Sequence, residues 1–137
     1  MSTVTDAQLV VKQYLEAYND RDIDRIREVV ADTIETEAST ITRNDLVDAI
    51  EAYWAAFPDC AHHDIHFVAD DDLVTVRTTF AGTHERAYHG LASTGESFEV
   101  TEFMMFRVTN GEIDAYWYAW DELGFFVQLG VLEHPLR

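Results

Sequence analysis

Lysine, cysteine and long apolar runs are almost missing from this sequence. Among its 137 residues, Lys12 is the single lysine and Cys60 the single cysteine, so no internal disulfide bond can form. No run approaches the 18 apolar residues of a membrane-spanning helix. The first residues hold neither a basic region nor an apolar run, so we predict no signal peptide and expect a cytoplasmic protein.

Basic residues are also few in total. Nine Lys and Arg residues stand against 26 Asp and Glu residues, which gives a net charge of −17. The phosphates of nucleic acids and of anionic membranes would be repelled, so we expect neither as a partner. The acids are spread through periodic segments that also carry aromatic residues, unlike a disordered acidic tail. We interpret this composition as that of a halophile's cytoplasm, where salt screens charges; an ordinary acidic protein is the alternative.

The chain is predicted to form one domain over residues 1–137, because 47% of it is hydrophobic and the length suits a single core. Helical spacing predicts three helices in the first half. The first follows a capping box at residues 5–8, the second covers residues 23–30, and the third runs from Thr42 to Pro58. Residues 33–38 alternate weakly and predict an edge strand.

After the third helix the apolar period changes to two, which is typical of strands. We predict strands at residues 65–69 and 73–84, a loop at 87–97, a hairpin from residue 100, and a short helix at 122–129. Helices followed by an antiparallel meander indicate an α+β domain. Three helices on one face of a curved sheet would leave a cavity for a small apolar molecule.

The hairpin turns at Asn110-Gly111, the strongest short signal for a type I′ turn. Counting from this turn pairs Arg107 with Asp114 and Met104 with Trp117. One face then holds Glu102, Met104, Trp117 and Asp121, and we interpret it as facing the core. The opposite face holds the aromatic and apolar residues Phe103, Met105, Tyr116, Tyr118 and Trp120. So much exposed apolar surface predicts a homodimer through the outer face of the sheet.

Asp121 follows a strongly aromatic strand and is the first candidate for chemistry. In the predicted register Glu102 and Asp121 are diagonal neighbours, about 7–8 Å apart. Burial and the second carboxylate would raise the pKa of one of them, which suits general acid–base catalysis near neutral pH. Alternatively, the strand ends at Ala119 and Asp121 only caps the following helix; the two roles can coexist.

Histidines offer further candidates. His84 ends a predicted strand and would hold a substrate oxygen or tune Asp121, or instead bond to the backbone of the adjacent loop. A metal site at His62, His63 and His66 is disfavoured, because in a strand His62 and His66 lie about 13 Å apart. We therefore expect no metal.

Several ordered motifs carry a family resemblance. They are residues 14–19 (YLEAYN) with Arg21-Asp22, residues 80–84 (FAGTH), His89-Gly90 with Thr94-Gly95, residues 106–108 (FRV) with Asn110-Gly111, and Trp117 and Asp121 before Leu123-Gly124 and residues 128–130 (QLG). In this order they resemble the SnoaL-like polyketide cyclases, or ester cyclases, of the nuclear transport factor 2-like superfamily. The chain departs from the pattern at Thr36 and Glu37, where many members have a histidine nearby, at the apolar Met104, and at Arg86 in place of a glycine.

The resemblance implies a cone-shaped α+β barrel, in which three N-terminal helices pack on the concave face of a curved, mostly antiparallel sheet, and commonly a homodimer. It also implies that the residue matching Asp121 is the general acid/base of a cofactor-free aldol ring closure.

Two functions follow. One is an enzyme without cofactor that acts on a small apolar carbonyl compound by aldol cyclisation, isomerisation or hydration, with Asp121 moving the proton and Glu102 or His84 biasing its protonation. The other is a binding domain with the same pocket and no turnover. Candidates for contacts to the ligand are Tyr14, Tyr18, Trp54, Phe57, Phe80, His89, Met104 and Trp117.

Overall fold

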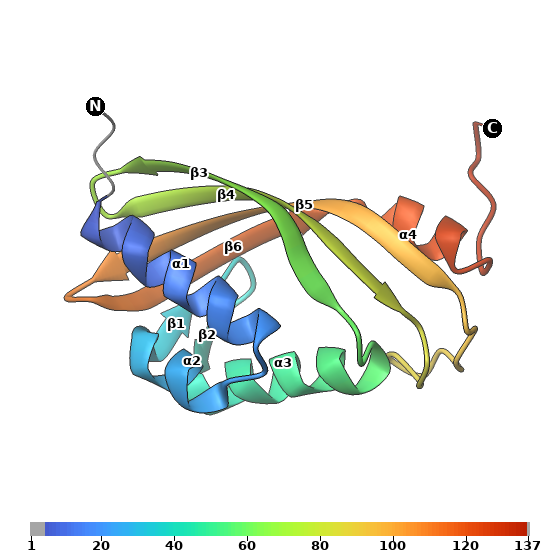
Figure 1. Cartoon of the computed structure of the whole chain (residues 1–137), viewed down its shortest axis with the longest axis horizontal. Helices are drawn as coiled ribbons and strands as arrows, with labels where there is room; N and C mark the ends of the chain where they lie inside the picture. Colours follow the sequence, from blue (N-terminus) through green and yellow to red (C-terminus); the bar gives the residue numbers. More distant parts are fainter. Residues whose placement is uncertain (1–4, 137) are drawn as a thin grey trace.

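The computed structural model describes residues 5–136, which form four helices and one six-stranded sheet (Figure 1). The helices are α1 (Asp6–Asn19), α2 (Ile23–Val29), α3 (Arg43–Ala56) and α4 (Glu122–Gln128). The strands are β1 (Val30–Glu35), β2 (Thr40–Thr42), β3 (Ala61–Asp70), β4 (Leu73–Thr83), β5 (Ser97–Thr109) and β6 (Glu112–Trp120). The α+β class, with helices first and a meander after them, is confirmed.

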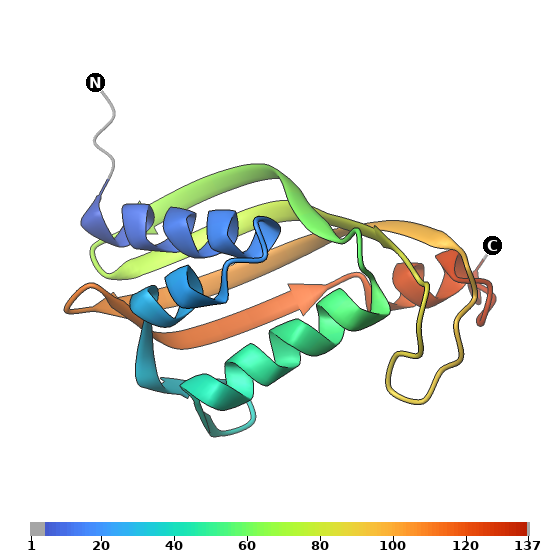
Figure 2. The same cartoon turned by 60° about the horizontal axis from the view of Figure 1, so that its bottom comes forward.

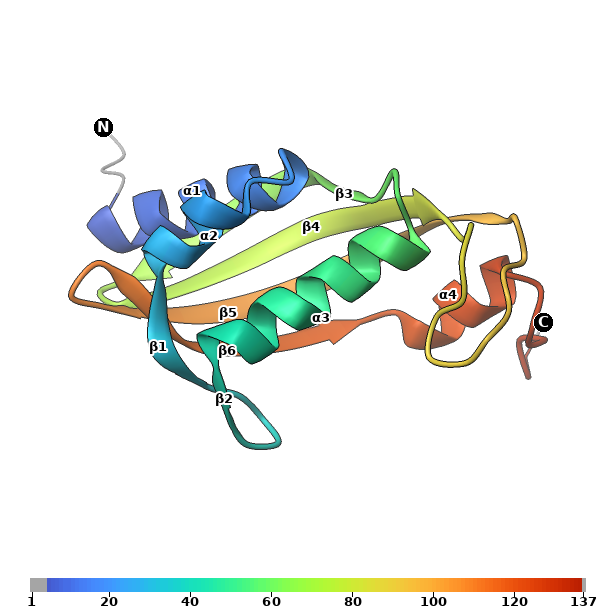
Figure 3. The same cartoon turned by 90° about the horizontal axis from the view of Figure 1, so that it is seen from below.

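The strands lie in the order β2-β1-β6-β5-β4-β3, and every neighbouring pair is antiparallel except β1 and β6. The sheet curves around α1, α2 and α3, which cover its concave face (Figures 2 and 3). It does not close, because β2 and β3 remain at its edges. The strand predicted at residues 33–38 is present over residues 33–35 as the end of β1, whereas residues 36–38 belong to the β1–β2 loop. Its placement at the edge was wrong, because β1 lies between β6 and the three-residue strand β2.

The hydrophobic core fills the space between the concave face and the helices. Val11 and Leu15 of α1 and Ile50 of α3 are buried against sheet residues such as Val76 and Phe106. Thr42 caps α3 in a reciprocal box, in which its hydroxyl accepts from the Asp45 N–H at 3.1 Å and Asp45 accepts from the Thr42 N–H at 2.9 Å. At α1, the Thr5 hydroxyl accepts from the Gln8 N–H at 3.0 Å.

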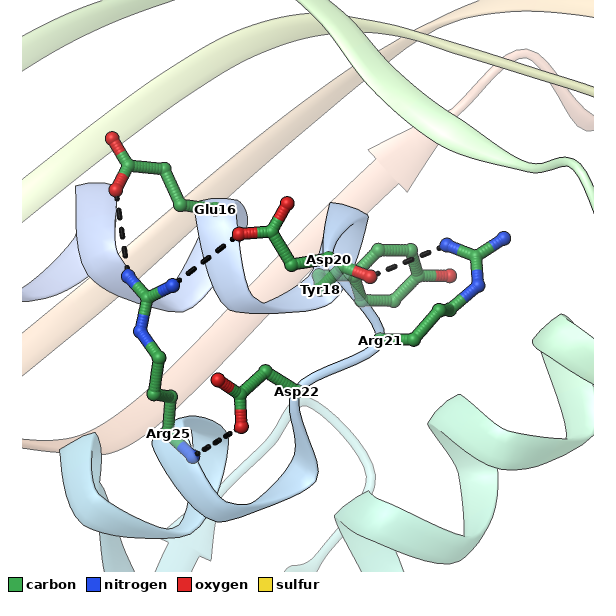
Figure 4. Close-up of polar contacts among 6 residues, drawn as sticks. All are labelled: Glu16, Tyr18, Asp20, Arg21, Asp22 and Arg25. Atoms are coloured by element: carbon green, nitrogen blue, oxygen red, sulfur yellow. Dashed lines mark hydrogen bonds and ion pairs between the residues drawn. The ribbon is translucent and has the colours of Figure 1, made fainter.

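The turn between α1 and α2 ties both helices to the rest of the chain (Figure 4). Arg25 bridges Glu16 and Asp20 at 3.5 and 3.3 Å, while its own backbone N–H donates to Asp22 at 3.2 Å. Arg21 adopts a left-handed conformation with φ of 61°. Its guanidinium points away from this network and donates to the carbonyls of Tyr18, Pro58 and Cys60 at 3.3, 2.8 and 2.8 Å. The turn therefore fixes where β3 begins.

A one-residue bulge interrupts the hairpin of β5 and β6. Val108 pairs with Ile113, as predicted, but Arg107 then pairs with Ala115 instead of Asp114. Asp114 is the extra residue, and its carboxylate accepts from the Arg107 guanidinium at 2.8 Å.

Every β6 side chain beyond this point lies on the opposite face from the one predicted, since strand side chains alternate with a period of two. Tyr116, Tyr118 and Trp120 face the concave side, where Trp120 pairs with Glu102; Trp117 and Ala119 pair with the outward-facing Met105 and Phe103. The register predicted beyond Ile113 was wrong.

None of the helices in the described part of the chain is long and apolar enough to cross a membrane.

The melting temperature is expected to rise steeply between low and molar KCl. The net charge of −17 opposes the compact state by self-repulsion, and added ions screen that repulsion. Thermal unfolding followed by circular dichroism tests this, with an uncharged osmolyte at matched osmolality as the control. A melting temperature that KCl moves no more than the osmolyte does would remove the halophilic interpretation.

Candidate functional site

A cavity of about 690 Å³ lies between the concave face of the sheet, the helices α1 and α3, and the β1–β2 loop. Eight aromatic residues border it: Tyr14, Tyr18, Tyr53, Phe80, Tyr116, Trp117, Tyr118 and Trp120. Aliphatic residues and Met104 also border the cavity. Its acidic residues are Glu37, Glu102 and Glu122. Within the described chain, no Lys or Arg borders the cavity, so the wall favours an uncharged, apolar ligand over an anion.

Glu102 is the buried acid of this cavity. It projects from the inner face of β5, beside Thr78 of β4 and Trp120 of β6, and is only 9% exposed. Its Oε1 atom has no hydrogen-bond partner within residues 5–136. Burial disfavours the charged form and raises the pKa of Glu102 from 4.5 to about 7. This carboxyl can therefore take up and release a proton near neutral pH.

His62 lies beside Glu102, with Nδ1 3.5 Å from Oε1. Burial, together with the charge of His63, lowers the pKa of His62 from 6.5 to about 3. Although the distance fits an ion pair, these pKa shifts oppose one: between about pH 3 and pH 7 the carboxyl of Glu102 is protonated and the imidazole of His62 is neutral. Asn19 fixes the position of His62, because its side-chain amide donates to the His62 carbonyl and accepts from the His62 N–H, both at 2.9 Å.

Two tyrosines border the cavity close to Glu102. The ring of Tyr14 meets Phe106 edge-on at 5.6 Å, and Tyr116 stacks on the same Phe106 at 5.1 Å. Burial raises the pKa of both phenols, and the charge of Glu102 raises it further. Both hydroxyls therefore remain protonated hydrogen-bond donors at neutral pH.

Most of the sequence-predicted contact residues border this cavity, namely Tyr14, Tyr18, Phe80, Met104 and Trp117, together with Glu102. Trp117 borders it even though it pairs with the outward-facing Met105. The ladder between β6 and β1 covers only Ile113 and Ala115 within the described residues. Within the described residues, the later part of β6 therefore has no strand paired to it on the β1 side, and its residues 116–120 all border the cavity.

Asp121 occupies a different place from the one predicted. It is the exposed N-cap of α4, where its Oδ1 accepts from the Gly124 N–H at 2.9 Å, and it does not border the cavity. A side chain at Gly124 would contact the Asp121 carboxylate in its present position, so the carboxylate would have to shift to accommodate it. The placement of Asp121 on the Glu102 face was wrong because the Asp114 bulge shifts the register, and the alternative reading of Asp121 as a helix cap describes its geometry.

Four other candidates also lie away from the cavity wall. His84 is fully buried, and its Nδ1 accepts from the Thr94 N–H at 3.2 Å, so it holds the loop backbone as the alternative expected. Phe57 packs in an aromatic cluster with Phe98 and Phe125. Trp54 lies 5.2 Å under the Arg21 guanidinium, and His89 sits in the loop with φ of 45°.

Residues 5–136 contain no group of three His, Cys, Asp or Glu side chains placed to hold a metal ion. His62 pairs across from Phe80, whereas His63 and His66 pair with Thr79 and Arg77. His62 therefore faces the cavity, and the other two face outward.

Several residues that border the cavity with Glu102 were not predicted there from the sequence. His62 was considered only as a metal ligand, because Glu102, which lies beside it in the structure, is far away along the chain. Tyr116 and Tyr118 were assigned to the outer face, since nothing in the sequence around Asp114 indicates the bulge. The one available signal was that three aromatic residues on a solvent-facing strand are unusual.

Helices packed on an open, curved sheet, with an apolar cavity between them, are the architecture of the nuclear transport factor 2-like fold. The chain belongs to the SnoaL-like polyketide cyclase family, whose model matches residues 8–129, so the resemblance is confirmed.

Solved structures agree with this assignment. IdmH of Streptomyces antibioticus, a proposed polyketide cyclase, is 27% identical with a TM-score of 0.81, over 93% of this chain and 100% of IdmH. TsrD of Streptomyces laurentii (23% identity, TM-score 0.84, 96% and 100% covered) shares the fold. So does a proposed SnoaL-like polyketide cyclase of Jannaschia sp. CCS1 (15%, 0.85, 97% and 98%). No curated protein shows significant sequence similarity to the chain.

Proposed function

We propose that this protein is a cyclase- or isomerase-type enzyme that acts on a small, uncharged carbonyl compound, with Glu102 as the proton-transfer group. The observation that carries the proposal is a buried carboxyl with a pKa of about 7 on the wall of an aromatic cavity that, within the described residues, holds no Lys or Arg. Membership of the SnoaL-like polyketide cyclase family supports the reaction class. The resemblance pointed to Asp121; we favour Glu102 because it borders the cavity and Asp121 does not.

The proposed chemistry begins with the ionised fraction of Glu102. Its carboxylate removes a proton from the carbon next to the ligand carbonyl, and the C–H electron pair forms the C=C bond of an enolate. In a cyclisation, the enolate carbon attacks a second carbonyl of the same molecule, whose oxygen takes the proton back from Glu102. In an isomerisation, Glu102 returns the proton to a different carbon.

The proton-transfer step can be tested without knowing the natural substrate. The probe is 2-tetralone, a two-ring ketone with an acidic C–H beside its carbonyl. In D₂O, followed by proton NMR, the protein is expected to accelerate exchange of this proton beyond the buffer rate. If 2-tetralone binds but exchanges at the buffer rate, the alternative of a binding domain without turnover is the better description.

We also propose that a second copy of the chain covers the outer face of the sheet. Val68, Thr75, Met105 and Trp117 form a row across four strands there, and Phe103 lies beside them. Val68, Phe103 and Met105 are 72%, 51% and 39% exposed, a large apolar area for a free surface. These residues replace the predicted dimer contacts Tyr116, Tyr118 and Trp120, which face the cavity side.

Phe103→Asp is expected to turn the dimer into a monomer, because it places a charge in the centre of the outer face. Light scattering after size exclusion in molar KCl measures the mass. Leu9→Asp on α1 is the matched control, since Leu9 is 45% exposed and lies on a helix away from this face. A wild-type protein that is monomeric at micromolar concentration contradicts the proposal.

A further inference from the structure

We propose that the hydroxyls of Tyr14 and Tyr116 together bind the carbonyl oxygen of the ligand and stabilise it as an enolate. This inference rests on the proposed function, because it assigns the oxygen-binding half of the site in which Glu102 moves the proton. It commits the ligand to one that presents a carbonyl or enol oxygen to two neutral donors.

The two tyrosines come from different elements and pack against the same aromatic ring. Tyr14 belongs to α1 and Tyr116 to β6, and both pack against Phe106 of β5, at 5.6 and 5.1 Å between ring centroids. A second stacked ring, Tyr118, lies 5.4 Å from Tyr116 on its own strand. Packing from several elements restricts both rings, so the hydroxyls are held in place before a ligand binds.

The hydroxyls of Tyr14 and Tyr116 have no hydrogen-bond partner within the described residues. Within residues 5–136, the Tyr18 hydroxyl has the Cys60 sulfur at 3.8 Å and the Tyr53 hydroxyl has that of Tyr88 at 3.5 Å, whereas those of Tyr14 and Tyr116 have no protein partner. Tyr118 is 54% exposed, so its hydroxyl is not held away from water. Tyr14 is buried, Tyr116 is half-buried and both border the cavity, so their hydroxyls can donate to a ligand oxygen.

The charges of the site fit this role. The pKa of both phenols is raised, mainly by burial and then by Glu102, so they donate hydrogen bonds instead of ionising. With no Lys or Arg in the described cavity wall, charge that develops on a ligand oxygen must be stabilised by neutral donors. Fixed donors in a cavity shielded from water serve this purpose better than the same groups in water.

The bulge at Asp114 is what brings the second hydroxyl to the cavity. If Asp114 were instead paired with Arg107 and the bulge were closed, Tyr116 would pair with Met105 and face outward. Bulges commonly re-aim side chains next to functional sites. The bulge in β6 therefore determines that Tyr116 faces the cavity.

Binding of 2-naphthol, an aromatic analogue of the enol of 2-tetralone, tests the pair against naphthalene, which lacks the oxygen. Ligand-observed NMR titrations give both affinities. Tyr14→Phe and Tyr116→Phe are each expected to weaken 2-naphthol binding by about 3- to 10-fold and to leave naphthalene binding unchanged, because one hydrogen bond is lost and the ring remains. Ser97→Ala, which removes an exposed hydroxyl outside the cavity wall, is the control and should change neither.

The wild type must bind 2-naphthol more tightly than naphthalene; equal affinities overturn the inference even if a variant fails to fold. It is also overturned if both variants keep the wild-type preference, or lose affinity for both compounds equally. Failure of the proposed function looks different. In that case 2-tetralone exchange stays at the buffer rate, while the preference for 2-naphthol and its loss in the two variants persist.

Discussion

The Glu102→Gln variant is expected to exchange the C–H proton of 2-tetralone about 10²–10⁴ times more slowly than the wild type, the usual size of a general acid–base contribution. Glutamine keeps the shape of glutamate but cannot take up the proton. The side chain has no fixed hydrogen bond at Oε1 and no buried cation beside it, so the fold should tolerate the change. Proton NMR in D₂O at neutral pH measures the exchange rate.

Asp121→Asn is the matched comparison, because it removes the carboxylate that the family resemblance singled out. Asparagine can also accept the hydrogen bond from Gly124, so α4 keeps its cap. We expect this variant to exchange 2-tetralone at close to the wild-type rate. The reverse outcome, a large loss at Asp121 and none at Glu102, would return the catalytic assignment to Asp121.

A second large effect is expected in the pH dependence of stability. In the folded chain the pKa of Glu102 is about 7, against 4.5 without burial, so the folded state holds this proton more tightly than the unfolded state. The resulting stabilisation is complete below pH 4.5 and is lost as the pH rises through 7. Converted at 1.36 kcal/mol per unit, the difference between about 7 and 4.5 is roughly 3 kcal/mol.

Glu102→Gln removes this dependence. Relative to the variant, the wild type should lose roughly 10 °C in melting temperature between pH 4.5 and pH 8.5, a shift that corresponds to roughly 3 kcal/mol in a domain of this size. Thermal unfolding in matched buffers at constant KCl measures the difference between the two proteins, which cancels the other carboxylates. A difference that is independent of pH would show that Glu102 is not desolvated in the folded state.

His62 is expected to act with the opposite sign. Burial lowers its pKa from 6.5 to about 3, so its stabilisation is present above pH 6.5 and is lost as the pH falls toward 3. A His62→Phe variant should therefore resist acid better than the wild type. Melting temperatures between pH 3 and pH 7 measure this effect, and equal acid sensitivity of the two proteins would contradict it.

The arrangement of helices and strands could be predicted because apolar periodicity and capping residues are local signals. Two places show this. Thr42 caps α3 together with Asp45, and Asn110-Gly111 forms the turn between two apolar strands, so in both cases neighbouring residues determine the local structure. The three-residue strand β2 was missed because it is too short to show a period. The parallel pairing of β1 with β6 depends on contacts far apart in the chain, which no local pattern records.

The candidate site was predicted only in part, for a physical reason. Glu102 and Met104 lie before the bulge on β5, so counting along the strand placed them correctly. Tyr116 and Asp121 lie after it, and one unpaired residue reversed their faces. Arg107 and Asp114 form an ion pair in the structure and were also expected to pair in the predicted register, so this contact could not distinguish the two.

The bulge also makes β6 a strand with two possible sets of inward-facing residues. Inserting one residue between Ala115 and Tyr116, with the bulge kept, would exchange Tyr116, Tyr118 and Trp120 for Trp117, Ala119 and a redirected Asp121 on the concave side, without altering any existing residue of the strand. A single-codon insertion is thus enough to replace the chemistry of the cavity wall while the helices and the rest of the sheet stay the same. Such a change offers a short evolutionary route between enzymes of different substrate preference, and a one-residue way to redesign the cavity.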